Sequence, residues 1–170
     1  MEKINLSIRK ADTNDCSRIR ELASRIWEPT YGSILPEEQL EYMFEMMYSV
    51  EHIRQQMTEL GHEYLIVYTD NEPAGYISIE KKTDDTFIFQ KIYTLPELHG
   101  KGLGRYLIEQ GIMYIQTMHP SPFTVELYVN RENPAVGFYE HLGMKKIATR
   151  DHDIGNGFYM NDYIMAMRIE

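Results

Sequence analysis

The spacing of apolar side chains along the chain changes character near residue 63. Before that point, a short alternation over residues 4–8 is followed by apolar residues at i, i+3, i+4 and i+7 over 19–26. Similar spacing returns over 40–47 and 53–60. Alternation is typical of a half-buried strand, and the longer spacing is typical of an amphipathic helix. This part of the chain therefore predicts one strand followed by three helices.

Capping and breaking residues set the expected helix ends. Asp12 or Thr13 is placed to cap the first helix, and Glu28-Pro29 and Gly32 predict a break at its end. Pro36 favours the first turn of the second helix. Ser49 is placed to cap the third helix.

After residue 63 the pattern predicts mainly strands. Three antiparallel strands are expected at 63–70, 74–81 and 86–94, separated by DNEP and KTDD turns. There follow a helix over 103–118 ended by the HPSP segment, a strand over 124–130, a short helix over 133–142 and two strands around the GNG turn. This order predicts one domain over residues 1–170, a mixed α/β fold of the α+β type with helices packed on a largely antiparallel sheet.

Composition narrows the class of protein. The 170 residues carry a net charge of −9, which disfavours nucleic acid as the main partner and is compatible with a cationic small substrate. Cys16 is the single cysteine, so we expect no intramolecular disulfide, and no Cys/His cluster implies a metal. No apolar run is long enough to cross a membrane, and residues 1–10 lack the apolar block of a signal peptide. We expect a cytoplasmic protein.

The most informative segment is a glycine-rich stretch just before helix 103–118. Gly100, Gly102 and Gly104 alternate there, and Lys101 and Arg105 add positive charge. Glycine permits positive φ and close approach of a ligand, while the unpaired N–H groups and dipole at a helix start favour a phosphate. The segment therefore predicts a phosphate-binding loop, although a glycine-rich turn before a helix is also a common structural feature.

Two well-known phosphate loops do not fit this segment. A P-loop requires glycine where Leu95 stands and Ser or Thr where Gly102 stands. A dinucleotide fingerprint beginning at Gly102 requires Gly or Ala where Leu107 stands. The loop is therefore expected to bind a phosphate that belongs to neither a nucleoside triphosphate nor NAD.

Two motifs resemble those of the GNAT superfamily of acyl-CoA-dependent N-acyltransferases. His99-Gly100-Lys101-Gly102-Leu103-Gly104 is similar to the family's pyrophosphate loop, Gln/Arg-x-x-Gly-x-Gly/Ala, with His99 in place of Gln or Arg. Asn133-Pro-Ala-Val-Gly-Phe-Tyr-Glu-His-Leu-Gly-Met144 resembles Asn-x-x-Ala-x-x-Phe-Tyr-x-x-x-Gly-Phe, with small departures. The motifs occur in the family's order, one helix and one strand apart, so the resemblance spans nearly the whole chain.

The resemblance implies a GNAT-like sheet that splits between its fourth and fifth strands, with acetyl-CoA as cofactor. The pantetheine arm would lie in the split between residues 92–94 and 127–130, and the pyrophosphate on N–H groups of the glycine loop. The implied cofactor-binding residues are Ile92, Tyr93, Thr94, His99, Gly100, Lys101, Gly102, Leu103, Gly104, Arg105 and Asn133.

The same resemblance implies direct attack of a neutral amine on the thioester through a tetrahedral intermediate. Tyr139 falls on the family's catalytic acid, since a phenol is protonated at neutral pH and can donate to the departing sulfur. A backbone N–H near Thr94 or Leu95 would bind the developing oxyanion. Many relatives carry a glutamate base on the fourth strand, where this chain has Gln90. The remaining candidates for the base, each through water and none preferred, are Glu28, Glu80, Glu126 and Asp153.

The acceptor site of the family is walled by the first helix pair and the late hairpin, which correspond to residues 27–32 and 151–159. Both segments mix carboxylates with aromatic rings, which favours a cation. Thr30-Tyr31 followed by residues 36–38 also resembles bacterial polyamine acetyltransferases. We therefore expect the primary amine of a small, cationic, polyamine-like acceptor, contacted by Trp27, Glu28, Tyr31 and Asp153.

Other functions stay open. An enzyme that acetylates proteins or peptides, or one that modifies antibiotics, would use the same chemistry. A non-catalytic acetyl-CoA sensor would also keep the glycines and Tyr139 while lacking a base on the fourth strand. Homodimers are common in the family, and the Met-rich segment 43–57 offers an apolar patch for one.

Overall fold

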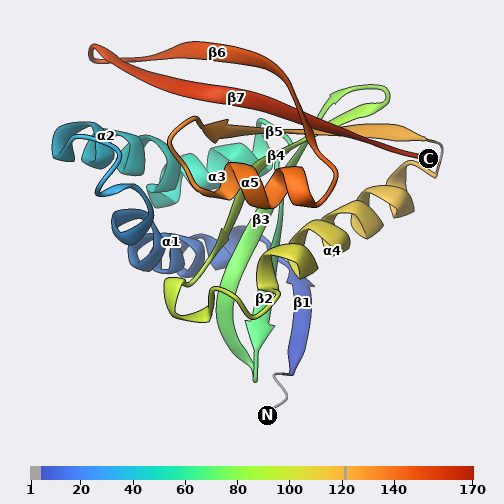
Figure 1. Cartoon of the computed structure of the whole chain (residues 1–170). Helices are drawn as coiled ribbons and strands as arrows, with labels where there is room; N and C mark the ends of the chain where they lie inside the picture. Colours follow the sequence, from blue (N-terminus) through green and yellow to red (C-terminus); the bar gives the residue numbers. More distant parts are fainter. Residues whose placement is uncertain (1–4, 121) are drawn as a thin grey trace.

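The computed structural model describes residues 5–120 and 122–170, and within them the chain forms a seven-stranded sheet with helices on both faces (Figure 1). The strands are β1 (Leu6–Lys10), β2 (Glu63–Thr69), β3 (Glu72–Thr83), β4 (Thr86–Thr94), β5 (Phe123–Asn130), β6 (Lys145–Gly155) and β7 (Phe158–Ile169). The helices are α1 (Cys16–Tyr31), α2 (Glu37–Tyr48), α3 (Val50–Thr58), α4 (Leu103–Met118) and α5 (Ala135–His141). Short 3₁₀ turns cover Thr13–Asp15 and Pro96–Leu98. Ile4 of the expected first strand and Ser121 of the HPSP segment lie outside the described residues.

The order of the long elements confirms the predicted fold class. The strands lie in the order β1-β2-β3-β4-β5-β7-β6, and the β4–β5 pair is parallel while the other neighbours are antiparallel. Ser49 caps α3 as expected, because its hydroxyl accepts the His52 N–H at 3.1 Å. The Asp12 carboxylate caps the 3₁₀ turn that leads into α1.

The expected break occurs at Gly32 and not at Glu28-Pro29. Helix α1 continues through Pro29 to Tyr31 and is capped at Gly32, whose N–H donates to the Glu28 carbonyl at 2.8 Å. A proline in the last turn of a helix removes only one backbone donor, and the Thr30 hydroxyl adds a bond to the Ile26 carbonyl at 2.8 Å. The continued helix carries Tyr31 onto the same face as Trp27, since residues four apart share a face.

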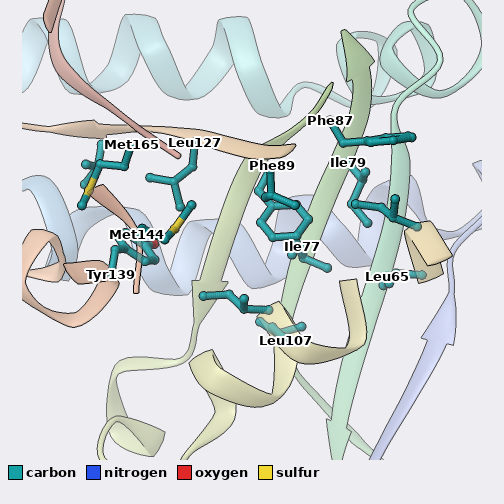
Figure 2. Packing of buried hydrophobic residues seen from close by; sticks show 14 of the residues in the cluster. Leu65, Ile77, Ile79, Phe87, Phe89, Leu107, Leu127, Tyr139, Met144 and Met165 are labelled. Atoms are coloured by element: carbon teal, nitrogen blue, oxygen red, sulfur yellow. The ribbon is translucent and has the colours of Figure 1, made fainter. Parts of the chain in front are cut away.

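Two apolar clusters fill the two faces of the sheet. On one face, α4 and α5 pack on the strands; Figure 2 shows Leu107 of α4 and Tyr139 of α5 beside strand residues such as Phe89 and Leu127. Gly111 lets α4 come close, because a Cβ there would lie 3.0 Å from Ile77 Cδ1. On the other face, α1, α2 and α3 bury a second cluster rich in aromatic rings.

The sheet opens between its two parallel strands. The β4–β5 register runs from Thr86 opposite Thr124 to Phe89 opposite Leu127, and the pairing ends there although both strands continue. The split that the resemblance implied is thus part of the fold. It creates a gap in which strand backbone is left without a strand partner, which is the kind of place where a ligand can bind strand backbone.

A β-bulge at Gln90 changes which way β4 faces. Ser78 pairs with Lys91 and Ile79 pairs with Phe89, so Gln90 is an extra residue in β4. Phe89 belongs to the cluster under α4, whereas Lys91 contacts Tyr64 in the cluster under α1–α3. Odd-numbered residues of β4 therefore face opposite sides of the sheet before and after the bulge.

Candidate active site

A cavity of about 680 Å³ lies at the split between β4 and β5. The residues expected to bind cofactor that line it are Ile92, Tyr93, Thr94, His99, Gly100, Gly102, Leu103, Gly104, Arg105 and Asn133. Lys101 is exposed and does not line it. The fold therefore brings the two sequence motifs, which lie one helix and one strand apart, to a single cavity.

The loop before α4 is shaped by glycine. Gly100 and Gly102 both have φ of +83°, a conformation that side chains disfavour. At Gly104 an added Cβ would lie 3.3 Å from Phe138 Cζ, so glycine there lets α4 approach α5. No side chain of residues 5–120 and 122–170 caps α4, so the N–H groups of its first turn and the positive end of its dipole can bind an anion. This cradle fits a pyrophosphate.

Polar side chains complete the same cavity. His99 and Arg105 stand at the loop, and Arg105 lies 4.0 Å from the Glu109 carboxylate. The Asn133 side-chain oxygen accepts the Ala135 N–H at 2.9 Å at the start of α5, which leaves its NH₂ group to donate elsewhere. Asn133 therefore has a structural contact through its oxygen, and its NH₂ group lies beside the cavity near the Tyr31 hydroxyl.

Four tyrosines also line this cavity: Tyr31, Tyr93, Tyr128 and Tyr139. The hydroxyls of Tyr31 and Tyr93 are hydrogen-bonded at 2.9 Å. Tyr139 comes from α5 and is 8% exposed. Burial, with a smaller contribution from the neighbouring Tyr31 phenol, raises the pKa of Tyr139 above the ordinary tyrosine value. Its hydroxyl therefore carries its proton at neutral pH and can donate it into the cavity.

The Leu95 N–H is not available for an oxyanion. It donates to the Ala74 carbonyl at 2.9 Å, which extends the β3–β4 ladder past Thr94. This excludes Leu95 as the donor that the resemblance suggested, because its N–H already has a partner. Thr94 lines the cavity and stays the candidate of the pair.

A second cavity of about 50 Å³ adjoins the first and shares Tyr31, Gln90, Tyr93 and Tyr128 with it. Its other lining residues come from α1, the α1–α2 connection, α2, β5, β6 and β7: Trp27, Leu35, Gln39, Met43, Met47, Asn130, Arg150, Tyr159, Met160 and Asp162. The β6–β7 hairpin reaches over α2 in Figure 1. Tyr42 and Gln39 of α2 donate to the carbonyls of Ile154 and Tyr159, both at 2.8 Å.

Asp162 is the one carboxylate among the described residues that line either cavity. Its side chain is 4% exposed and accepts from Arg150 Nε at 3.0 Å. Burial raises the pKa of Asp162 above its ordinary value, and Arg150 opposes that rise. The Arg150 guanidinium also lies 3.7 Å from the centroid of the Tyr128 ring. The second cavity is thus an aromatic pocket with a neutralised ion pair in its wall.

The four expected acceptor contacts divide into two groups. Tyr31 lines both cavities, and Trp27, only 3% exposed, lines the second. Glu28 follows the buried Trp27 in helix α1, and it is exposed. Its carboxylate lies against Gly32. Asp153 is exposed and accepts the Gly155 N–H at 2.8 Å in the hairpin turn. Neither carboxylate lines either cavity, so contact of Glu28 or Asp153 with the acceptor stays a prediction that the cavity linings do not support.

The other two candidates for the base lie on strands outside both cavities. Glu126 is bound by Lys82 at 3.0 Å. Glu80 is bound by the Gln90 amide at 2.9 Å and by the His62 ring at 3.2 Å, and Gln90 itself lines both cavities. Glu80 therefore lies outside the cavities but is hydrogen-bonded to Gln90, a residue that lines both of them.

Sequence reasoning missed Tyr128, Arg150 and Asp162. The alternation of residues 123–130 could have placed Tyr128 on the face of the sheet opposite to Leu127. No sequence signal pairs Arg150 with Asp162, because that contact depends on the register between β6 and β7.

Residues 33–166 match the family described as the acetyltransferase (GNAT) domain. The chain belongs to the GNAT acetyltransferase family. It is an acyl-CoA-dependent N-acetyltransferase, and its cofactor is acetyl-CoA. The strand split, the uncapped start of α4 and the glycine cradle provide the backbone groups that such a cofactor requires.

Several proteins are similar to this GNAT chain. A spermidine N(1)-acetyltransferase of Thermoplasma acidophilum is 25% identical over 79% of this chain and 84% of that protein. The crystal structure of the PaiA N-acetyltransferase of T. acidophilum, in complex with coenzyme A, superposes with a TM-score of 0.78 at 25% identity, covering 97% of this chain and 99% of that one. The ribosomal-protein-S18-alanine N-acetyltransferase of Escherichia coli has a TM-score of 0.71 at 19% identity, covering 97% and 94%. The fold is therefore shared by enzymes with different acceptors.

The described part of the GNAT chain contains no helix that is long and apolar enough to span a membrane.

Proposed function

We propose that this GNAT enzyme acetylates a primary amine of a small cationic acceptor of the polyamine type. The observation that carries the proposal is the second cavity, which adjoins the cofactor cavity at Tyr31, Gln90, Tyr93 and Tyr128. An amine in the second cavity would have its reacting nitrogen beside the residues that the two cavities share. The similarity to a spermidine N(1)-acetyltransferase supports the same acceptor class.

Aromatic rings, rather than net charge, would hold the cation. Trp27 packs on Tyr31 at 4.8 Å and on Tyr93 at 6.0 Å between ring centroids, and Tyr128 and Tyr159 line the same cavity. The faces of such rings attract an ammonium group. Asp162 is already paired with Arg150, so its charge is largely satisfied before an acceptor binds. A flexible aliphatic chain would also find apolar contacts with methionines of α2 and β7.

Acetyl-CoA supplies the activated acetyl group as a thioester. Around it, the backbone of β4 and the start of α4 would bind and orient the cofactor, and Tyr139 would hold the proton that the departing thiolate takes up. The amine must lose a proton before it attacks, because an aliphatic ammonium has a pKa near 10. Trp27, Tyr31 and Tyr93 would exclude water from the side of the acceptor.

A thiol-release assay with a panel of amines tests the proposal. The panel holds spermidine, spermine, amino acids, aminoglycosides and short peptides, each with acetyl-CoA. A matched pair, 1,8-diaminooctane and octylamine, differs only in the second amino group. We expect kcat/KM for the diamine to exceed that for the monoamine by about tenfold, as expected for one desolvated cation–π contact.

Three outcomes would contradict the proposal in different ways. Equal kcat/KM values for 1,8-diaminooctane and octylamine would show that a second ammonium group does not contribute to binding of the acceptor. Turnover confined to peptides would establish a protein acceptor, and turnover confined to aminoglycosides an antibiotic-modifying enzyme. Tight binding of acetyl-CoA without turnover of any panel member would indicate a cofactor sensor.

A further inference from the structure

The bulge in β4 places Gln90 beside both cavities and in contact with Glu80, which in turn contacts His62. Gln90 lines both cavities, so its side chain lies where the cofactor and acceptor spaces meet. As the extra residue of the bulge, it is free of the alternation that fixes its neighbours. Its NH₂ group donates to Glu80 Oε1 at 2.9 Å, across the boundary between β3 and β4.

The second oxygen of Glu80 is held from behind by His62. The distance from His62 Nε2 to Glu80 Oε2 is 3.2 Å, and the two side chains are 10% and 28% exposed. His62 Nδ1 is buried without a partner among the described residues. A buried N–H without an acceptor costs more than a bare ring nitrogen, so Nδ1 carries no proton and Nε2–H donates to Glu80. Burial also lowers the pKa of His62, in agreement with a neutral ring.

These contacts decide which way the Gln90 amide points. A carboxylate can only accept hydrogen bonds, so the NH₂ group of Gln90, and not its oxygen, must face Glu80. The amide oxygen then points away from Glu80. Within the described parts of the chain that oxygen has no protein partner, and it is not among the buried polar atoms that lack one. It is therefore an open acceptor on a side chain that lines both cavities.

We infer that Gln90 presents its amide oxygen to an N–H of the acceptor amine, and that Glu80, anchored by His62, holds Gln90 in that orientation. Gln90 is then a substrate-binding residue, and Glu80 and His62 are positioning residues that act through it. The inference rests on the proposed function for the place of the amine in the second cavity. It makes the absence of a carboxylate at position 90 meaningful, since an amide held this way directs the nitrogen without taking its proton.

Replacing Glu80 by glutamine gives a sharp test. In Glu80→Gln, the His62 Nε2–H keeps the new amide oxygen in place, so the new NH₂ group faces Gln90. Gln90 must then offer its oxygen to residue 80 and turn its own NH₂ group toward the cavities. The amine would meet a donor in place of an acceptor, and we expect kcat/KM for the best amine of the panel to fall about tenfold. The KM for acetyl-CoA and the melting temperature should stay close to those of the wild type.

A matched control and a double-mutant cycle separate positioning from a general structural effect. Glu63→Gln removes a comparable strand carboxylate whose partner is Lys10, at 3.0 Å, rather than Gln90 or His62, and should change kcat/KM less than about twofold. Gln90→Met keeps the volume and removes the amide, and should also cost about tenfold. If Glu80 acts through Gln90, adding Glu80→Gln to Gln90→Met should have almost no further effect. An undiminished effect in the double variant would overturn the positioning role.

A second measurement needs no acceptor. The side-chain NH₂ signals of Gln90, identified by their loss in Gln90→Met, are expected in the wild type as a pair with one proton protected from exchange by the carboxylate. In Glu80→Gln that protection should be lost. Unchanged signals would overturn the inferred orientation, whatever amine the enzyme uses. Loss of protection, with no preference for cationic amines in the panel, would contradict the proposed function alone and leave the orientation of Gln90 established.

Discussion

Tyr139 is the tyrosine that α5 contributes to the cofactor cavity, which the hydrogen-bonded pair Tyr31 and Tyr93 also lines. Because burial raises the pKa of Tyr139, its hydroxyl stays protonated at neutral pH and has a proton to give. Replacing Tyr139 by phenylalanine should lower kcat about a hundredfold, since general acid catalysis typically contributes this much or more. The dissociation constant of acetyl-CoA should change little.

Pre-steady-state thiol release and calorimetric binding of acetyl-CoA check this prediction. Tyr163→Phe is the matched control, because it removes a hydroxyl but keeps the ring that stacks under Lys146, 4.4 Å from the ring centroid. A Tyr139→Phe enzyme with wild-type kcat would show that another group protonates the sulfur.

Lys91 makes a second prediction at the scale of one residue. Its ammonium is buried on β4, bonded to Gln56 Oε1 at 2.8 Å and to the Tyr64 hydroxyl, and burial lowers its pKa to about 7. The unfolded chain keeps the ordinary value near 10.5, so between these pH values the unfolded state binds a proton that the folded state has lost. Stability must then rise with pH in this window, because the unfolded state binds more protons.

The measurement compares the wild type with Lys91→Met, which lacks this group. From pH 7 to pH 9, the free energy of unfolding of the wild type should rise by about 2 kcal/mol relative to the variant, as one proton is linked to folding. Urea titrations at both pH values give the difference. A difference that does not change with pH would mean that Lys91 is not desolvated in the folded protein.

At the scale of the element, the start of α4 depends on glycines with positive φ. Gly102 and Gly61 have φ of +83° and +74°, and at both an added Cβ would meet nothing within 4 Å. Alanine at either position therefore introduces similar backbone strain, of about 1 kcal/mol. Only Gly102 belongs to the cofactor cavity. Gly102→Ala should raise the KM for acetyl-CoA about tenfold, since a shifted loop misaligns the N–H groups at the helix start.

Gly61→Ala serves as the strain-matched control for that experiment. Both variants should lose a similar amount of stability in thermal melting, while the KM for acetyl-CoA stays at the wild-type value in Gly61→Ala. Equal KM values in the two variants would show that the loop before α4 does not bind the cofactor.

The elements themselves were largely predictable. Strand β4 runs from Thr86 to Thr94, as the apolar pattern predicts, and α4 begins at Leu103 directly after the glycines. The bulge inside β4 was not predictable, because Phe89 and Lys91 read as ordinary members of one strand. Whether a strand keeps or loses a residue of register depends on its partner, here β3, and not on its own composition.

At the scale of the whole molecule, a net charge of −9 affects the approach of a cationic acceptor, before the aromatic rings of the second cavity hold it. A cationic amine is drawn toward an acidic protein, and salt screens that attraction. Raising NaCl from 0.05 to 0.3 M should increase the KM for a polyamine about threefold, whereas the KM for octylamine should change less because it carries one charge. Initial rates at saturating acetyl-CoA give both values. A polyamine KM independent of salt would contradict electrostatic attraction of the acceptor.

The chain by itself determined the order of its helices and strands and the place of the glycine loop, because periodicity and glycine placement report local burial and local backbone conformation. Tyr139 was singled out only by the resemblance of its motif to the family's. Only the tertiary structure decided which side chains share the acceptor cavity. It moved Glu28 and Asp153 to the surface and brought together Arg150 with Asp162, and Gln90 with Glu80 and His62. Those contacts join strands and helices far apart in sequence, and they depend on register, on one bulge and on the packing of α2 against the hairpin. Such features arise from pairing between segments, which no single segment encodes.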